Sequence, residues 1–140
     1  MKRIIFSFTF LVCLFLMSSE VSAQKNTSNN SSVEVLYFHG KQRCMTCRAI
    51  EKVTRDALSQ YFAKEMKAGK VKFRVIDISL PQNEKIAEKY QVTWSSLYIN
   101  QWKGRKEQVN NLTEQAFANA RTNPDKFKSI VRQKVLSLLK

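Results

Sequence analysis

The sequence predicts an α/β fold with a central mixed sheet of about four strands flanked by helices. A near-continuous apolar run at 33–38 is typical of a strand buried on both faces, and residues 71–78, where Val71, Phe73 and Val75 alternate with Lys72, Arg74 and Ile76, predict a second buried strand. A helical pattern of apolar residues separates them and opens at a Cys-x-x-Cys motif over 44–47. A third apolar run at 97–99, followed by a turn at Gly104, predicts a further strand and a hairpin.

The helix after the first strand is predicted from apolar residues spaced by three and four. They recur until Gly69, a residue that commonly ends helices, and are Ile50, Val53, Ala57, Leu58, Tyr61, Phe62 and Met66. A short helix is expected over 81–90, and residues 106–109 are expected to complete the hairpin. Because helices separate the first three strands, we expect these strands to be parallel, with the hairpin strand antiparallel.

Two helices are expected at the end of the chain. Thr113 is placed to cap a helix that runs to about Ala120, and Asn123-Pro124 begins another, since proline suits the first helical turn. The last helix is amphipathic and basic. We interpret it as a terminal helix that closes the core, and a membrane-surface helix is the alternative.

The chain is expected to divide into three segments. Residues 1–23 resemble a signal peptide, with a basic start, an apolar run over 4–17 and small residues leading to cleavage after Ala23. An uncleaved membrane anchor is the alternative. Residues 24–32 are polar and are expected to form a disordered linker, and 33–140 to form one domain. A periplasmic or secreted location follows.

Cleavage would remove one of the three cysteines and leave Cys44 and Cys47. A bridge between them closes a very small loop and so constrains the unfolded chain little. A redox or metal role is therefore favoured over a stabilising disulfide. The pair lies where a strand gives way to a helix, and a helix N-terminus stabilises a thiolate.

The net charge of +13 falls to +12 once residues 1–23 are removed. A basic cytoplasmic protein would suggest nucleic acid as a partner. The predicted export, and the lack of a cluster that alternates aromatic and basic residues, argue against it. A solvated basic surface is the plain interpretation, with an acidic partner protein or an anionic lipid surface as alternatives.

Residues 36–51 carry a resemblance to a known family. They read Leu-Tyr-Phe-His-Gly-Lys-Gln-Arg-Cys-Met-Thr-Cys-Arg-Ala-Ile-Glu. With the order of elements, this segment resembles the thioredoxin-like superfamily, and more closely the small exported proteins labelled nitrophenyl-compound nitroreductase subunits. The resemblance implies a thioredoxin-like fold from 33 to the C-terminus. Nothing in the sequence resembles a flavin site, and we expect no cofactor.

The segment departs from typical thioredoxins, which carry Trp-Cys-Gly-Pro-Cys. Met45 and Thr46 lie between the cysteines here. The cis-proline that faces the dithiol in the family is absent, and counting places its position at about Ser96. The buried acid of the first strand is also missing, and Phe38 takes its approximate place. Trp94, Ser95 and Ser96 are expected to form the substrate-facing loop.

The resemblance implies that Cys44 is the exposed attacking nucleophile and Cys47 the covered resolving thiol. Arg43 and Arg48 lie near in sequence, and cations favour the thiolate, so we expect a lowered pKa for Cys44. Such a pair would be more oxidising than thioredoxin. His39 is expected either to tune the site or carry protons, or to have no chemical role.

Two classes of function fit these residues. The favoured one is an exported thiol–disulfide oxidoreductase, with a thiol or disulfide protein as partner and an unidentified redox donor. The alternative is a dithiol protein that binds a soft metal or metalloid ion, for which two ligands are few; we assign no metal ligands. A non-catalytic thioredoxin-like interaction module is a third interpretation. Trp94 either covers the dithiol or belongs to the core.

Overall fold

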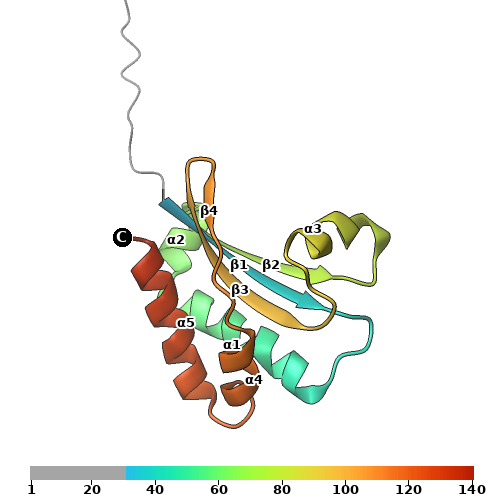
Figure 1. Cartoon of the computed structure of the whole chain (residues 1–140). Helices are drawn as coiled ribbons and strands as arrows, with labels where there is room; N and C mark the ends of the chain where they lie inside the picture. The colour runs from blue at the N-terminus through green and yellow to red at the C-terminus, as the bar shows by residue number, and fades with distance from the viewer. Residues whose placement is uncertain (1–30) are drawn as a thin grey trace, which may run out of the picture.

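The computed structural model describes residues 31–140 (Figure 1). The predicted signal peptide and residues 24–30 of the predicted linker lie outside the described residues. Strand β1 spans Ser31–His39, so the first strand begins two residues before the boundary that we expected. Ser31 is held there by its side chain, whose hydroxyl donates to the Leu138 carbonyl at 2.9 Å and accepts from Gln101 at 3.0 Å. These partners are distant in sequence, so the polar residues around Ser31 could not predict these hydrogen bonds.

Four strands form one mixed sheet in the order β2-β1-β3-β4. The other three strands are β2 (Val71–Asp77), β3 (Ser96–Lys103) and β4 (Lys106–Gln108). Strand β1 is parallel to β2 and antiparallel to β3, and β3 and β4 form an antiparallel hairpin. The predicted mixed sheet of about four strands is confirmed.

The direction of β3 differs from our expectation that the first three strands are parallel. Helix α1 (Met45–Tyr61) is 17 residues long, about 26 Å, and returns the chain to the end of the sheet where β1 begins. Helix α3 (Glu84–Lys89) has six residues, about 9 Å, whereas a seven-residue strand such as β2 spans about 23 Å. The chain therefore enters β3 at the end where β2 finished, and β3 runs antiparallel.

The remaining elements are short except for the last helix. They are α2 (Ala63–Lys67), the 3-10 turn η1 (Pro81–Asn83), α4 (Thr113–Asn119) and α5 (Pro124–Leu138). The first predicted helix is broken at Phe62, whose φ of −132° and ψ of 24° are not helical. Helices α1, α4 and α5 lie on one face of the sheet and α3 lies on the other (Figure 1).

The alternation of β1 divides the core between the two faces, because successive strand side chains point to opposite sides. Val33, Val35 and Tyr37 pack with α1, α4 and α5 in the larger cluster. Leu36 and Phe38 pack beneath α3 in the smaller one, with four further buried residues: Ile76, Tyr90, Val92 and Tyr98. Both faces of β1 are thus buried, as its apolar run predicted.

Helix α5 completes the larger core. It buries Phe127, Val131, Val135 and Leu138 and packs against α1, which confirms the predicted closing helix. A parallel βαβ unit followed by a helix, an antiparallel hairpin and a closing helical segment is the thioredoxin-like arrangement, and the predicted fold class is confirmed. Within residues 31–140, no helix has the length and apolar character needed to cross a membrane.

Candidate functional site

The two cysteines lie at the N-terminus of α1, just beyond the loop that follows β1. Cys44 is the N-cap residue and is exposed, whereas Cys47 lies in the first turn and is only 7% exposed. They form a disulfide, with their Cα atoms 5.1 Å apart. The Cys47 amide N–H donates to the Cys44 Sγ at 3.1 Å. Cys44 is therefore the exposed residue of the pair and Cys47 the covered one.

The helix end favours negative charge at the Cys44 sulfur. The first turn of α1 contains no acidic residue, so nothing on the helix offsets its positive end. In the reduced protein, a Cys44 thiolate at the N-cap position would accept the same amide N–H that its sulfur accepts in the disulfide. The helix thus supplies a physical reason for an activated thiol.

Tyr37 lies beneath the dithiol and was not among the residues that we expected in the site. Its hydroxyl donates to the Cys47 carbonyl at 2.6 Å, and its side chain is fully buried. Burial raises the pKa of the Tyr37 hydroxyl, which hydrogen bonding to Ser95 and Arg43 opposes. The hydroxyl therefore stays protonated at neutral pH and remains a donor to the turn that carries Cys47.

The position of Tyr37 corrects our placement of Phe38 near the buried acid of thioredoxins. Phe38 points to the opposite face of the sheet, where its ring centroid lies 5.5 Å from that of Tyr90 and 5.8 Å from that of Tyr98. The side chain that β1 directs under Cys47 is Tyr37. Tyr37 could have been identified from the sequence, because side chains alternate between the two faces of β1 and the apolar side of α1 must pack on one of these faces.

Arg43 forms an ion pair with Glu51, so its charge is not free to act on the Cys44 sulfur. Its guanidinium pairs with Glu51, which also pairs with Arg55 at 2.8 Å, and it lies 5.5 Å from the centre of the Tyr37 ring. Burial lowers the pKa of Arg43, but hydrogen bonds to Glu51 and Tyr37 outweigh burial and raise it.

The shared carboxylate is held ionised. Burial alone would raise the pKa of Glu51, but hydrogen bonds from Arg55 and Arg43 reverse the effect and lower it. The charge of Arg43 is therefore compensated, and it favours a Cys44 thiolate less than the sequence suggested. Arg48 is exposed on α1 and forms no ion pair with an acid of residues 31–140.

His39 ends β1 and lies on the same face as Tyr37, with the two ring centroids 6.0 Å apart. Its Nδ1 lies 2.9 Å from the carbonyl oxygen of Gly40, and its backbone pairs with Asp77 of β2. Over the described part of the chain, no hydrogen bond joins the imidazole to Cys44 or Cys47.

The loop before β3 contains the three residues expected to face a substrate. Trp94 is 63% exposed and stacks on Phe117 of α4, with ring centroids 5.7 Å apart, so the interpretation as a core aromatic is wrong. Ser96 is buried and donates to the Trp94 carbonyl at 3.2 Å. Ser95 is buried, and its side chain lies near enough to the Tyr37 hydroxyl to lower the pKa of that group against the effect of burial. Among residues 31–140 no peptide bond is cis.

The structure brings Ser95, rather than Ser96, to the residues beneath the dithiol. Tyr37 joins the two sides, because its hydroxyl donates to the Cys47 carbonyl and lies near the Ser95 side chain. The counted position of the family's cis-proline stays at about Ser96, where this chain has a small, buried polar residue.

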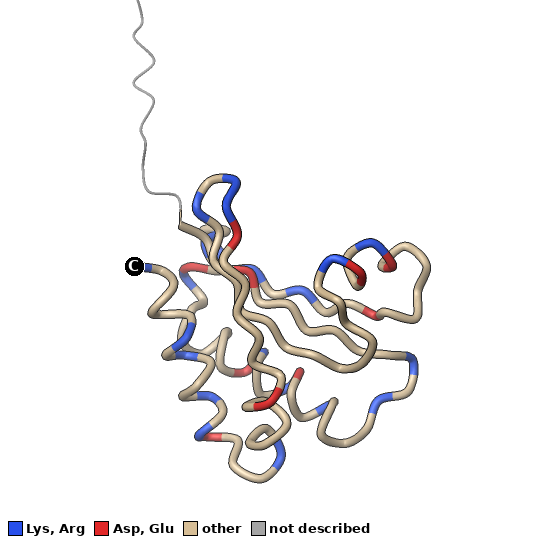
Figure 2. Tube along the Cα trace, in the orientation of Figure 1, with Lys and Arg blue, Asp and Glu red and all other residues tan. Residues whose placement is uncertain are grey.

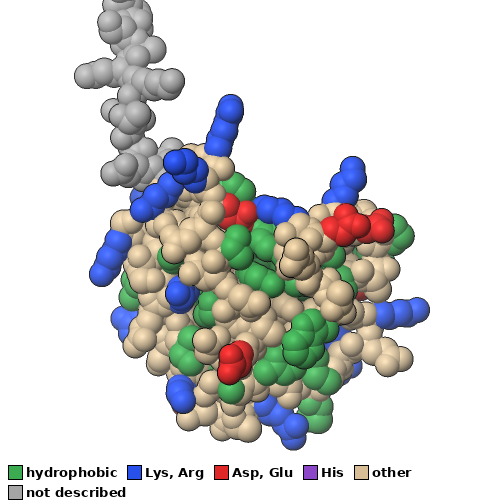
Figure 3. Space-filling view, in the orientation of Figure 1, with side chains coloured by type: hydrophobic (Ala, Val, Ile, Leu, Met, Phe, Trp, Pro, Cys, Tyr) green, Lys and Arg blue, Asp and Glu red, His purple; other side chains and the backbone are tan. Residues whose placement is uncertain are grey.

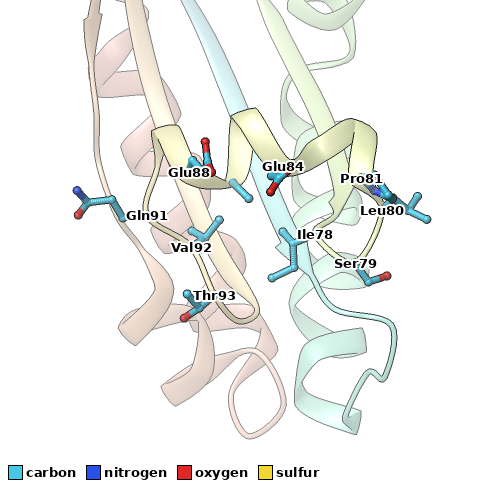
Figure 4. Close-up of a pocket in the computed structure, with 10 residues that line it drawn as sticks. Ile78, Ser79, Leu80, Pro81, Glu84, Glu88, Gln91, Val92 and Thr93 are labelled. Atoms are coloured by element: carbon cyan, nitrogen blue, oxygen red, sulfur yellow. The ribbon is translucent and has the colours of Figure 1, made fainter.

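Two hollows flank this loop. One, of about 650 Å³, lies between α3 and the loop, as Figure 4 shows, and is lined by Ile78, Ser79, Leu80, Pro81, Glu84, Ala87, Glu88, Gln91, Val92 and Thr93. The other, of about 640 Å³, lies on the α4 side and is lined by Gln91, Val92, Trp94, Ser96, Tyr98, Asn111, Thr113, Glu114, Gln115 and Phe117. The second contains the exposed Trp94–Phe117 pair and two residues of the expected substrate-facing loop.

The described residues contain no group of three or more His, Cys, Asp or Glu side chains placed to hold one metal ion. Within residues 31–140, the dithiol therefore offers two sulfur ligands without a third from these types.

Two solved structures resemble the chain at low identity. A structure described as that of a malarial protein is 17% identical, with a TM-score of 0.46, and the match covers 75% of this chain and 98% of that one. The solution structure of a thioredoxin from Thermus thermophilus is 14% identical, also with a TM-score of 0.46, and the match covers 74% and 73%. No protein-family model and no curated protein matches the chain. The fold assignment rests on the order and direction of the chain's own strands.

Proposed function

We propose that this chain is an exported thiol–disulfide oxidoreductase that works through Cys44 and Cys47. The observation that carries the proposal is the asymmetry of the pair: an exposed cysteine at the N-terminus of α1 is bonded to a buried cysteine in the first turn. Exchange requires one sulfur that a partner can reach and a second that resolves the mixed disulfide.

The exchange balances in two steps. A substrate thiolate attacks the Cys44 Sγ, the bond to Cys47 breaks, and Cys47 leaves as a thiolate that takes up a proton. A second substrate thiolate then attacks the substrate sulfur of the mixed disulfide and releases Cys44. The substrate dithiol is oxidised to a disulfide, and the protein disulfide gains two electrons. The reverse sequence reduces a substrate disulfide.

The surroundings of the dithiol support these steps. The positive end of α1 stabilises Cys44 as the leaving thiolate, and Tyr37 anchors the carbonyl of Cys47. The Trp94–Phe117 pair offers an apolar surface in the hollow beside the substrate-facing loop, suited to a side chain of a protein substrate.

Export is part of the same proposal and is supported by sequence alone. The basic start, the apolar run over 4–17 and the small residues up to Ala23 have the pattern of a cleaved signal peptide. A periplasmic or secreted location would keep the dithiol where disulfides persist. The finer relationship, to the exported family labelled nitrophenyl-compound nitroreductase subunits, rests on residues 36–51.

Turnover of insulin disulfides in the presence of dithiothreitol tests the function. We expect the wild type to accelerate reduction and both Cys44→Ser and Cys47→Ser to lose the acceleration. Met45→Ala is the matched control, because Met45 is exposed between the cysteines and both thiols remain; it should keep activity within a few-fold. Full activity in Cys44→Ser would refute the proposal. Stoichiometric binding of arsenite or copper(I) without exchange would favour the soft-ion alternative.

A further inference from the structure

A cluster of unpaired cations lies at the end of the sheet opposite the dithiol. The hairpin between β3 and β4 carries Lys103, Arg105 and Lys106, all exposed, around Gly104. Gly104 has a positive φ of 60°, which favours glycine and lets the chain turn tightly enough to hold three cations in four residues.

Two further lysines reach the same end through backbone pairing. Ser31 of β1 pairs with Lys103, and the Val33 amide donates to the Lys70 carbonyl at 2.7 Å. The Ser31 hydroxyl also holds the Leu138 carbonyl, which brings Lys140 to this end. We call these five cations the basic end: Lys70, Lys103, Arg105, Lys106 and Lys140. Figures 2 and 3 show Lys and Arg gathered around the point where the grey trace meets the fold.

The basic end is uncompensated within the described chain. None of its cations pairs with an acid of residues 31–140, whereas five other basic side chains do. The acids nearest along the strands are already engaged, because Glu34 pairs with Arg74 and Glu107 with Lys89. Glu65 of α2, whose carbonyl accepts from the Lys70 amide, is one further acid near this end, so five cations still exceed the acid there and keep a positive field that a partner of opposite charge would neutralise.

The start of the chain indicates which partner this is. Residues 4–17 form an apolar run that is expected to enter a membrane during export, and 13 residues separate it from Ser31. Until cleavage after Ala23, these thirteen residues span at most about 45 Å and keep the end of the fold where Ser31 lies nearest that membrane, so the released domain starts out with this end facing it. Cys44 lies beyond the opposite end of β1, which is a nine-residue strand about 30 Å long.

We propose that the basic end docks on anionic phospholipid headgroups, with the dithiol facing away from the membrane. Long, exposed cations on a hairpin and a chain terminus suit a diffuse anionic surface, because each contributes through charge rather than through a shaped pocket. The orientation leaves Cys44 free for a protein partner, so the inference rests on the proposed export but not on the proposed exchange chemistry.

Sedimentation with vesicles tests this proposal. The exported protein, with its N-terminus verified by mass spectrometry, is mixed with phosphatidylglycerol vesicles or with neutral phosphatidylcholine vesicles. The test variant carries Lys103→Glu, Arg105→Glu and Lys106→Glu. The control variant carries Lys85→Glu, Arg121→Glu and Lys126→Glu, which change the net charge equally at exposed sites on other elements. All proteins share one N-terminus, so the comparison isolates the hairpin.

We expect binding to the anionic vesicles alone, weakening as salt rises. The hairpin variant should bind at least about a hundredfold more weakly than the wild type, and the control variant should lose much less. Equal losses in both variants, or no binding to anionic vesicles, would overturn the proposal. Hairpin-dependent binding to polyglutamate without vesicle binding would also overturn it and indicate an acidic protein partner. A Gln version of the hairpin variant, with near-ultraviolet circular dichroism, separates lost binding from lost folding.

Discussion

The hydrogen bond from Tyr37 to the Cys47 carbonyl is the contact by which the fold holds the covered cysteine. Tyr37→Phe removes the hydroxyl and keeps the ring, so the packing of the larger core is preserved. The substitution leaves the Cys47 carbonyl without its 2.6 Å donor at a buried site. It therefore isolates one polar contact beneath the dithiol.

The expected cost follows from burial. A buried polar group that loses its partner costs about 1–3 kcal/mol, and the short distance and full burial of Tyr37 favour the upper half of that range. We expect the free energy of unfolding to fall by about 2 kcal/mol. In a domain of this size that corresponds to a fall in Tm of roughly 8–12 °C. Because the contact anchors the turn of Cys47, the exchange rate should also fall.

Urea unfolding of the oxidised and reduced forms, together with insulin turnover, measures these effects. Tyr98→Phe is a comparison for stability, because the Tyr98 hydroxyl also donates to a backbone carbonyl, that of Tyr90, but at 3.3 Å and in the smaller core, and it accepts from Asn111 at 3.2 Å. It should cost about 1 kcal/mol, and its exchange rate is not compared because Tyr98 lines the hollow beside the substrate-facing loop. A Tyr37→Phe variant that loses less than about 0.5 kcal/mol, or that exchanges at the wild-type rate, would refute the anchoring role.

Two further predictions concern other parts of the molecule. Burial would raise the pKa of Glu107, but hydrogen bonds from Lys89 and Tyr90 outweigh it and lower the pKa, so the unfolded chain binds the proton first as the solution is acidified. Stability should therefore be full above about pH 4.5 and fall below it, and Glu107→Gln should flatten that fall in chemical unfolding measured across pH; an unchanged slope would contradict the assignment. Trp94→Ala should cost about 1 kcal/mol or less, because the side chain is exposed and loses mainly its stacking on Phe117, yet it should lower kcat/KM for a protein substrate several-fold. A loss above 3 kcal/mol in thermal unfolding would instead indicate a core role.

Local patterns were enough to predict most of the fold. The apolar run of β1, the spacing of three and four in α1 and the amphipathic face of α5 each specify an element through periodicity, which needs no knowledge of tertiary contacts. The direction of β3 could not be predicted in this way, because it depends on how far the short α3 carries the chain relative to the length of β2.

The sequence predicted only those site residues that lie close together along the chain. Cys44 and Cys47 could be predicted from their spacing and from their place at the start of a helix. The pairing of Arg43 with Glu51 could not be predicted, because those residues meet across two turns of α1 and a loop. The role of Tyr37 depends on which face of β1 lies under the helix, which only the packed structure fixes.

The reactivity of the two thiols in the reduced protein tests the central claim most directly. Alkylation by iodoacetamide, followed across pH with mass spectrometry to locate the label, gives the rate and the apparent pKa for each cysteine. The exposed N-cap position predicts that Cys44 is labelled first, with a pKa below the ordinary value of about 8.5, while Cys47 stays protected. Faster labelling of Cys47, or a Cys44 pKa at or above about 8.5, would contradict the account.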